Sequence, residues 1–211
     1  FDITVVGGGM VGAAIALALS QAGLQVALIE KLAPVAFDAQ STPDLRVSSV
    51  NLASEAWLSD LGAWQALQQM RLCPYQRLQA FEYQQSVVTF NAADIDRSHL
   101  GHIVENNLLQ LALWQQLGSN VQVFCPSSVT ALEQTADSAI LTLDSGEKLS
   151  SDLVVAADGG HSLLRQLAGI GTNGWQYRQA CLVALVKTPY PQQDVTWQQF
   201  TPSGPKAFLP L

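Results

Sequence analysis

The hydrophobic pattern at the start of the chain predicts a strand, a buried helix and a second strand. Residues 2–6 and 25–30 are short apolar runs typical of strands, and residues 10–22 have the dense apolar pattern of a buried helix. Gly23 follows at the position where a glycine commonly ends a helix. The chain therefore opens with a β-α-β unit.

The middle of the chain mixes helical and hairpin patterns. Residues 53–70 indicate two helical segments separated at Gly62, and residues 107–117 indicate a further helix. Between them, residues 77–83 and 87–91 are expected to form a hairpin that turns near Gln84, Gln85 and Ser86.

From residue 121 onward the pattern is mainly β. The expected strands are residues 121–124, 129–133, 139–143, 148–150, 153–157, 180–186 and 195–200. Asp144-Ser145-Gly146 predicts a tight hairpin turn. The run 153–157 is wholly apolar, as in a parallel strand covered on both faces, and residues 162–168 follow it as a short helix.

These elements predict an α/β fold with two domains. A Rossmann-like domain with a parallel sheet and a β-meander is expected at residues 1–71 and 100–171. Part of a second, antiparallel-sheet domain is expected at residues 72–99 and 172–211. The chain starts without Met and stops directly after an apolar run, so we expect a fragment that is incomplete at its C-terminus.

One glycine pattern, Gly7-x-Gly9-x-x-Gly12, lies between the first predicted strand and helix. In a dinucleotide-binding turn the three glycines permit the tight turn, the approach of a pyrophosphate and close packing of helix on strand, respectively. The N–H groups of the first helical turn, at Met10, Val11 and Gly12, would face the phosphates.

Glu30, at the end of the next strand, could accept hydrogen bonds from a ribose. A purely structural turn with a chance carboxylate is the alternative.

The same spacing recurs at Gly169, Gly171 and Gly174. This copy follows a predicted helix and precedes a predicted strand, so no helix N-terminus would face a phosphate. We interpret Gly169 as a helix end and predict a single nucleotide site, which could hold NAD or the ADP half of FAD.

Composition excludes several other classes of function. The net charge is −7, and a nucleic-acid-binding protein needs a basic face. The three cysteines are isolated, which suits a reducing cytosol. The three histidines have no Cys or His partners at ligand spacing, so we expect no metal site. The apolar stretch 10–19 is too short to span a bilayer, so no transmembrane segment is expected.

A second motif separates NAD from FAD. The apolar strand 153–157 continues as Asp-Gly-Gly-His-Ser-Leu-Leu-Arg, which matches Asp-Gly-x-x-Ser-x-x-Arg and places Asp158 and Gly159 at the carboxyl edge of the sheet. The chain here resembles the flavin-dependent aromatic hydroxylases of the para-hydroxybenzoate hydroxylase type. It departs from their usual pattern at Ala156 and at Gly160-His161. Asp158 could equally cap the following helix.

That resemblance implies further cofactor-binding residues. Arg46, in Leu-Arg-Val-Ser-Ser, matches the flavin-contacting arginine of the family, although an arginine exposed at the surface is the alternative. Asn106 stands where relatives often carry Arg or Gln, and could simply cap its helix. Val129 is implied to pass the adenine through backbone groups, with core packing as the equal alternative.

The ubiquinone-biosynthesis branch of the family shows the greatest similarity, through segments 101–106 and 204–211. The resemblance implies an FAD-dependent monooxygenase that uses NAD(P)H and O2 to hydroxylate the ring of a prenylated quinol. The cofactor performs the difficult step, so no catalytic acid or base is nominated. A further FAD motif of the family would lie beyond residue 211, so we expect the fragment to be inactive by itself.

The resemblance also implies a cytoplasmic protein that could associate peripherally with the inner membrane surface or with a biosynthetic complex. Two alternatives stay open. One is another flavoprotein oxidoreductase of the same fold, and the other is a non-catalytic nucleotide-binding protein.

Overall fold

The computed structural model describes residues 1–82, 86–189 and 193–211. The chain divides into two compact units, and each is described by itself. The first unit comprises Phe1–Ala36 and Gln110–Cys181, and the second comprises Phe37–Leu109 and Leu182–Leu211. The predicted domain boundaries group residues 37–71, 100–109 and 172–181 differently, and they stay a prediction.

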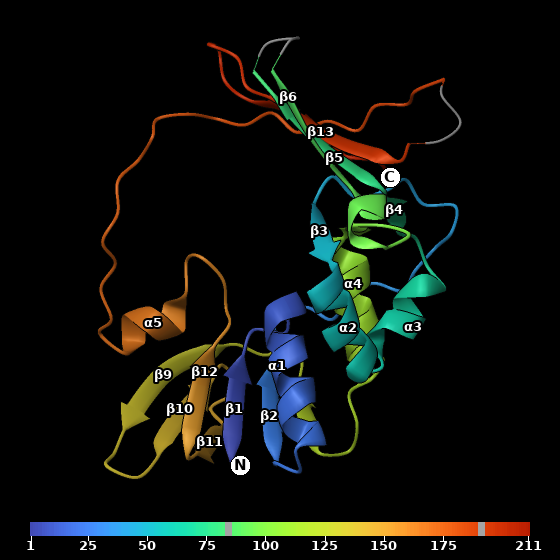
Figure 1. The fold of residues 1–211 in the computed structure, drawn as a ribbon. Helices are drawn as coiled ribbons and strands as arrows, with labels where there is room; N and C mark the ends of the chain where they lie inside the picture. The colour runs from blue at the N-terminus through green and yellow to red at the C-terminus, as the bar shows by residue number, and fades with distance from the viewer. Residues whose placement is uncertain (83–85, 190–192) are drawn as a thin grey trace. The chain divides into compact units, whose positions relative to one another are not determined.

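The first unit is built on a parallel sheet with strand order β12-β1-β2-β8 (Figure 1). Its strands are β1 (Ile3–Val6), β2 (Val26–Ile29), β8 (Val121–Phe124) and β12 (Leu153–Ala156). Helix α1 (Met10–Gln21) connects β1 to β2, so the predicted β-α-β unit is confirmed. Every residue of β1 and β2 is buried, because these two strands lie at the centre of the sheet.

Helix α1 approaches the sheet closely because its buried positions are small. Ala13, Ala14 and Ala16 are almost fully buried, and Leu17 is the large apolar side chain beside them. Gly23, with a φ of +92°, follows the C-cap residue Ala22 and allows the chain to turn back into β2.

Strand β12 lies at the edge of the parallel sheet, and the expectation that it is covered on both faces is wrong. Leu153 is 55% exposed and Ala156 is exposed as well. The prediction failed because an apolar run does not distinguish a central strand from an edge strand that keeps part of its surface in solvent.

A three-stranded antiparallel meander completes the first unit, in the order β11-β10-β9. Its strands are β9 (Val129–Gln134), β10 (Ala139–Leu143) and β11 (Lys148–Ser151). The predicted turn is confirmed, since Gly146 has a φ of +86° and its N–H donates to the carbonyl of Leu143. Helix α5 (Leu163–Leu167) follows β12, and Leu164 packs into the core with Val129 and Leu141.

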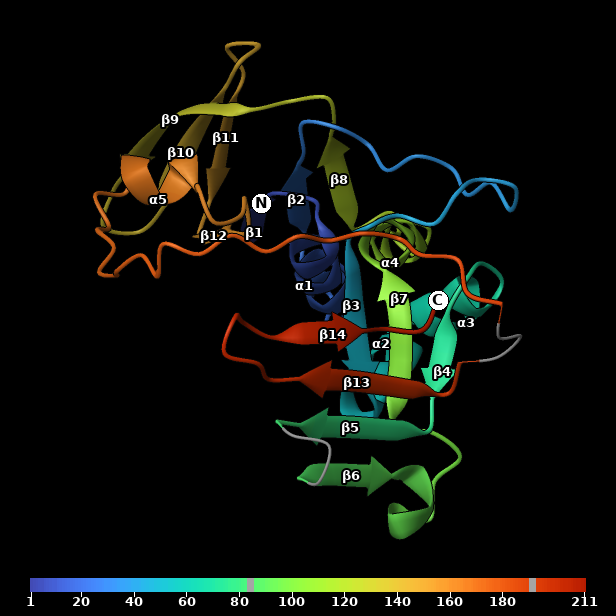
Figure 2. The same cartoon turned by 90° about the horizontal axis from the view of Figure 1, so that it is seen from above.

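The second unit contains two sheets, which Figure 2 shows from above. One has the order β3-β7-β4, from β3 (Val47–Asn51), β4 (Cys73–Tyr75) and β7 (Gly101–Glu105). The other has the order β14-β13-β5-β6, from β5 (Arg77–Phe81), β6 (Val87–Asn91), β13 (Val195–Gln199) and β14 (Lys206–Phe208). The pair β5–β6 is antiparallel, as predicted. The pair β13–β14 is also antiparallel, although the sequence did not predict strand β14, and β13 runs parallel to β5.

The two predicted helical segments of the second unit are confirmed, and a short 3-10 helix that the sequence did not predict is present as well. They are α2 (Leu52–Asp60), α3 (Ala63–Gln68) and a 3-10 helix at Ala92–Ile95. Gly62, with a φ of +79°, separates α2 from α3. Helix α4 (Asn106–Trp114) begins in the second unit, and its residues from Gln110 onward belong to the first.

Two predictions about strands, at residues 180–186 and at the β5–β6 hairpin, had different outcomes. Residues 180–186 do not form the predicted strand, and Leu182 is 92% exposed, because an apolar run alone does not determine that a strand forms. The β5–β6 hairpin is confirmed, while Gln84 and Gln85 of its predicted turn lie outside the described residues.

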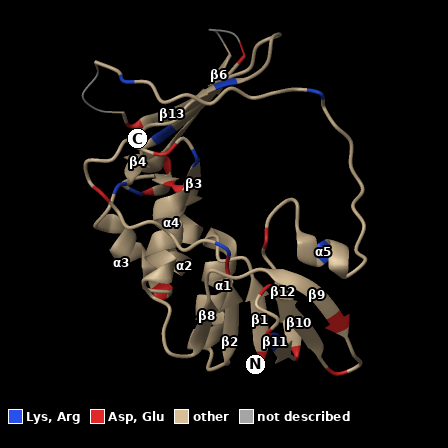
Figure 3. Ribbon diagram, turned by 180° about the vertical axis from the view of Figure 1, so that it is seen from behind, with Lys and Arg blue, Asp and Glu red and all other residues tan. Residues whose placement is uncertain are grey.

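The charges of both units are dispersed. Figure 3 shows Lys and Arg scattered along the ribbon rather than gathered on one element. Among the described residues, no helix has the length and apolar character needed to cross a bilayer.

Candidate nucleotide-binding site

Three of the predicted site segments meet at one edge of the parallel sheet. The strands β12, β1 and β2 are neighbours, and their last residues are in register, with Val6 beside both Ala156 and Ile29. The glycine turn, Glu30 and Asp158 directly follow these ends. Ligands of open α/β sheets bind at the carboxyl ends of the strands, so the topology brings the predicted groups to the expected edge.

Gly7 and Gly12 are required by the packing of the turn itself. A Cβ on Gly7 would lie 2.4 Å from the carbonyl oxygen of Ala157, and the φ of Gly7 is +99°. A Cβ on Gly12 would lie 1.8 Å from the carbonyl oxygen of Gly7 and 3.0 Å from the Cβ of Ala157. The two glycines thus let β1, α1 and the end of β12 pack closely, as the sequence predicted.

Gly9 is not required by any contact within the chain. It has the ordinary backbone angles of an N-cap residue, with φ −64° and ψ 179°, and a Cβ on it would meet no atom within 4 Å. The side of the turn where a Gly9 side chain would lie is therefore open. A closely approaching ligand is the reason for a glycine at such a position.

The first turn of α1 offers unoccupied donors beside Gly9. The first N–H groups of a helix have no intrahelical partner, and here they include those of Met10, Val11 and Gly12. Within the described part of the chain no side chain caps this helix, and its first turn contains no acidic residue to neutralise the helix dipole. Val11 is 61% exposed. This end of the helix can accept an anionic group.

Helix α4 holds the glycine turn in place through two side chains that the sequence did not predict. Gln110 donates from Nε2 to the carbonyl of Gly8 at 2.8 Å, and Trp114 donates from Nε1 to the same oxygen at 2.7 Å. These residues stand on one face of a helix that is distant in sequence, so no local pattern could have identified them.

The Glu30 carboxylate braces the same turn. Its Oε2 accepts a hydrogen bond from the N–H of Gly8, and its Oε1 accepts from the N–H groups of Lys31 at 2.7 Å and Leu32 at 3.1 Å. A carboxylate has about four acceptor sites, so these three bonds leave room for one more. The structure thus adds a structural role to the ribose contact, which stays a prediction.

Asp158 has one satisfied and one unsatisfied oxygen. Its Oδ2 accepts from the N–H of Leu164 at 3.1 Å, at the start of α5. Ser162 is the N-cap residue of that helix, so the capping alternative for Asp158 is met only in part. Its Oδ1 is buried and has no hydrogen-bond partner among the described residues. A buried carboxylate oxygen without a donor points to a group that the chain itself does not supply.

The electrostatics of Asp158 favour its charged form. Burial by itself would raise its pKa, but the hydroxyl of Ser162 and the N–H groups of Leu164, Asp158 and Leu163 outweigh that effect and lower the pKa. Asp158 is therefore an anion with a free acceptor at neutral pH.

Gly159 and Val129, two further predicted site residues of the first unit, lie in different environments. Gly159 is exposed and has a φ of +88°, which glycine adopts readily as the chain leaves β12. The side chain of Val129 is buried in the core with Val6 and Ile29, so its core-packing alternative is observed. A contact of its backbone with adenine stays a prediction.

Arg46 and Asn106 belong to the second unit, where they lie beside one another. The N–H of Asn106 donates to the carbonyl of Arg46 at 2.9 Å, and the amide oxygen of Asn106 accepts from the hydroxyl of Ser48 at 2.7 Å. Arg46 is exposed, as its alternative interpretation expected. Contacts of both residues with a flavin stay predictions.

An ion pair between a partly exposed arginine and a buried glutamate fixes the loop that carries Arg46. Nε of Arg71 lies 2.9 Å from Oε1 of Glu105, whose side chain is 3% exposed. Arg71 also donates to the carbonyl and the hydroxyl of Ser41, and Glu105 accepts from the N–H of Asp44. The sequence showed Glu105 only as part of a family segment and did not reveal this role.

The second glycine pattern does not lie between a strand and the start of a helix, and the interpretation of Gly169 as a helix end is confirmed. Gly169 has a φ of +69°, and its N–H donates to the carbonyl of Gln166 at the end of α5. A Cβ on Gly171 or Gly174 would meet nothing within 4 Å. The next element in the described part of the chain is strand β13.

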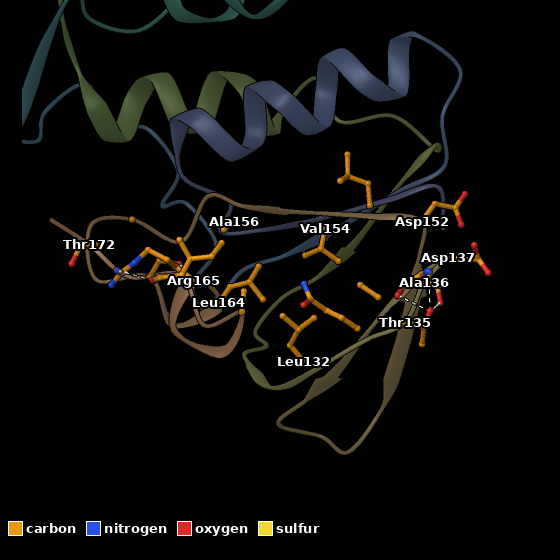
Figure 4. Close-up of a pocket in the computed structure, with 18 of the residues that line it drawn as sticks. Leu132, Thr135, Ala136, Asp137, Asp152, Val154, Ala156, Leu164, Arg165 and Thr172 are labelled. Atoms are coloured by element: carbon orange, nitrogen blue, oxygen red, sulfur yellow. Dashed lines mark hydrogen bonds between the residues drawn. The ribbon is translucent and has the colours of Figure 1, made fainter.

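A pocket of the first unit lies between β12, the meander and α5 (Figure 4). Its lining includes Leu132, Val154, Leu164 and Arg165, whose Nη1 donates to the carbonyl of Ile170. Gly159 lines it, but no residue of the glycine turn does. The pocket is thus distinct from the edge where Gly9 is open.

The model for the FAD binding domain family matches residues 1–210 of the chain. The chain belongs to this family. The resemblance to flavin-dependent hydroxylases is thereby confirmed, and so is the α/β fold class, which its structural neighbours share.

Curated relatives agree with the ubiquinone-biosynthesis branch of the FAD binding domain family. The chain is 47% identical over 212 residues to 3-demethoxyubiquinol 3-hydroxylase of Escherichia coli, covering 100% of this chain and 54% of the relative. It is 34% identical over 229 residues to the mitochondrial ubiquinone biosynthesis monooxygenase COQ6 of Rattus norvegicus, covering 100% and 48%. The chain thus spans about half the length of the curated relatives that it matches.

Solved structures share the fold. A Klebsiella pneumoniae HpxO variant complexed with FAD is similar with a TM-score of 0.69 and 20% identity, covering 99% of this chain and 53% of that one. PqsL of Pseudomonas aeruginosa, described as a probable FAD-dependent monooxygenase, has a TM-score of 0.66 and 19% identity, covering 83% and 47%.

Proposed function

We propose that this chain holds the ADP part of FAD in a monooxygenase that hydroxylates the ring of a prenylated quinol in ubiquinone biosynthesis, with NAD(P)H and O2 as co-substrates. Family membership and the two ubiquinone-biosynthesis relatives support the cofactor and the pathway. The E. coli relative supports a demethoxyubiquinol-type substrate.

The observation that carries the proposal is the combination of an open Gly9 and an unsatisfied Asp158 at one sheet edge. The N–H groups of Met10, Val11 and Gly12 hold the pyrophosphate at the N-terminus of α1. Glu30 accepts from the ribose with its remaining site. Asp158 provides a carboxylate that takes a donor from the cofactor or from its bound water, and the exposed Gly159 next to it leaves room for that group.

The chain's own residues bind and orient rather than react. Bound FAD supplies the electron transfer and oxygen activation for which side chains have no equivalent. We assign no catalytic acid or base. Arg46, Asn106 and the backbone of Val129 complete the proposed set of cofactor contacts.

The substrate suggests where the protein acts. A prenylated quinol resides in a bilayer. The protein is therefore proposed to be cytoplasmic and to associate with the inner membrane surface or with a biosynthetic complex. Residues 1–211 alone are proposed to lack hydroxylase activity, and quinol-dependent O2 consumption by this chain alone would contradict that part.

The test compares FAD retention after gel filtration, measured by flavin absorbance per chain. Gly9→Val places its Cβ on the open side of the turn, where no atom lies within 4 Å, so we expect only a small loss of thermal stability and an affinity for FAD lowered about tenfold or more, roughly 1.4 kcal/mol. Gly171→Val, the same change at the second glycine of the other pattern, is the matched control and should retain FAD fully.

Glu30→Gln provides a second arm, because the amide keeps one acceptor oxygen but loses the charge. We expect partial loss of FAD together with some loss of stability, because one of the two oxygens that accept backbone N–H groups becomes a donor. Full retention of FAD by both Gly9→Val and Glu30→Gln would refute the proposed site.

A further inference from the structure

Three side chains of the second unit converge although they come from different elements. Glu55 lies on α2, His102 lies on β7, and His99 lies shortly before that strand. Oε2 of Glu55 is 2.9 Å from Nε2 of His99 and 3.2 Å from Nδ1 of His102. One ligand atom from each residue lies within 4.8 Å of the other two.

The spacing of these atoms suits a metal ion. With bonds of about 2.0–2.1 Å, the ligand atoms of a tetrahedral zinc ion lie about 3.3 Å apart. The two measured distances to Glu55 are close to that separation, so only small side-chain movements are needed to admit an ion. Two imidazoles and a carboxylate are also ligands that zinc accepts, whereas calcium and magnesium prefer oxygen alone.

The state of His102 is a second, independent indication. Its side chain is only 10% exposed, and Nδ1 is buried without a hydrogen-bond partner in the described part of the chain. Nδ1 lies near the Glu55 carboxylate but without the geometry of a hydrogen bond. A buried ring nitrogen that is aimed at a carboxylate and a second imidazole, yet unsatisfied, is explained by a cation between them.

Neighbouring groups hold the two rings in position. The hydroxyl of Ser98 lies 2.9 Å from Nδ1 of His99, which leaves Nε2 directed at Glu55. The edge-on contact of Trp64 with His102, at 5.0 Å between ring centroids, fixes the other ring. Such outer contacts orient the histidine ligands of metal sites.

We propose that Glu55, His99 and His102 bind one Zn²⁺ ion through Oε2, Nε2 and Nδ1, with a water molecule at the fourth position. The ion links α2 to β7 and so stabilises the second unit. The sequence suggested no metal site because only His and Cys spacing was considered, and Glu55 joins the cluster through the fold alone.

Zinc binding to the purified protein tests the proposal. Chelator-treated protein in a reducing buffer is titrated with ZnCl₂ by calorimetry, and bound zinc is counted by elemental analysis. We expect one zinc per chain and a higher Tm in its presence. His99→Ala and Glu55→Gln should weaken binding about tenfold or more and abolish the rise in Tm, since each removes a ligand.

The control variant is His161→Ala, which removes the remaining histidine of the chain, an exposed one, and should leave zinc binding unchanged. Circular dichroism of each variant establishes that it is folded before zinc is added. His99→Ala is preferred to a change at His102, because His102 is buried among aromatic groups.

Cobalt provides a readout that does not depend on the variants. Co²⁺-loaded wild-type protein should show the visible bands of a four-coordinate site without the charge-transfer band of a thiolate. Absence of zinc binding would overturn the proposal and leave a Glu55–histidine hydrogen-bond network. So would a thiolate band, or binding that persists unchanged in both ligand variants.

Discussion

The chain contains two glycine patterns of identical spacing that have different structural roles. In Gly7–Gly12 the glycines lie between a buried strand and a 12-residue helix, and two of the three would clash with backbone or side-chain atoms if they carried a side chain. In Gly169–Gly174 the first glycine ends a helix, and none of the three would meet a neighbour.

The difference shows that the pattern acquires its meaning from the elements around it. The first copy places a helix N-terminus at the carboxyl end of a parallel strand, where donors and the helix dipole favour an anion. The second copy comes after the C-terminus of α5 and is exposed. Substitutions at matched positions of the two patterns should therefore have unequal effects.

The largest contrast is expected at the third glycine. Gly12→Ala would place a Cβ 1.8 Å from a backbone oxygen that cannot move without displacing β1, so we expect a loss of about 3 kcal/mol or more in the free energy of unfolding. Gly174→Ala introduces a Cβ into open space and should change that free energy by roughly 0.5 kcal/mol or less. Urea denaturation measures both.

If both variants were as stable as the wild type, the close approach of α1 to Gly7 would not be maintained in solution. A shared loss of stability would instead show that Gly174 has contacts that the structure does not show.

An intermediate effect is expected at the first glycine of the second pattern. Gly169→Ala meets no atom but forces alanine to a φ of +69°, which costs about 1 kcal/mol. FAD retention should not change, because this glycine only ends a helix. A fall in flavin content without a fall in Tm would contradict that assignment.

The smallest expected effect is a pH-dependent change in stability at Asp158. The folded-state pKa of Asp158 is lowered, so the stability that its ionised form contributes is present above the unfolded value of about 3.9 and is lost as the pH falls through the folded value. Asp158→Asn should therefore unfold more easily than wild type at pH 7, and the difference should shrink below about pH 4. Urea midpoints from pH 7 to pH 3 measure it, and a constant difference would argue against an ionised Asp158.

Local chemistry made much of the nucleotide-binding edge predictable. The turn, its helix and the acid after β2 are close in sequence, and each residue type has a physical reason at its position. The position of Asp158 was predicted because a residue that follows a parallel strand lies at the carboxyl edge of the sheet.

Other features depend on partners that are distant in sequence. The bonds from Gln110 and Trp114 to Gly8 require the packing of α4. The edge position of β12 depends on the strand order, and the lack of a strand at 180–186 depends on the tertiary arrangement of the chain. An apolar run has the same composition in an edge strand as in a segment that forms no strand.

The ion pair between Arg71 and Glu105 has an evolutionary consequence. Arg71 donates to Glu105 from Nε and Nη2 and to Ser41 from Nη1 and Nη2, a set of contacts that a lysine cannot reproduce. Loss of Arg71 would leave the buried Glu105 carboxylate without its cationic partner, and loss of Glu105 would leave a half-buried guanidinium unpaired at that side. In homologous sequences, positions 71 and 105 should therefore change together or not at all, and the loop before Arg46 should vary in length only where both are retained.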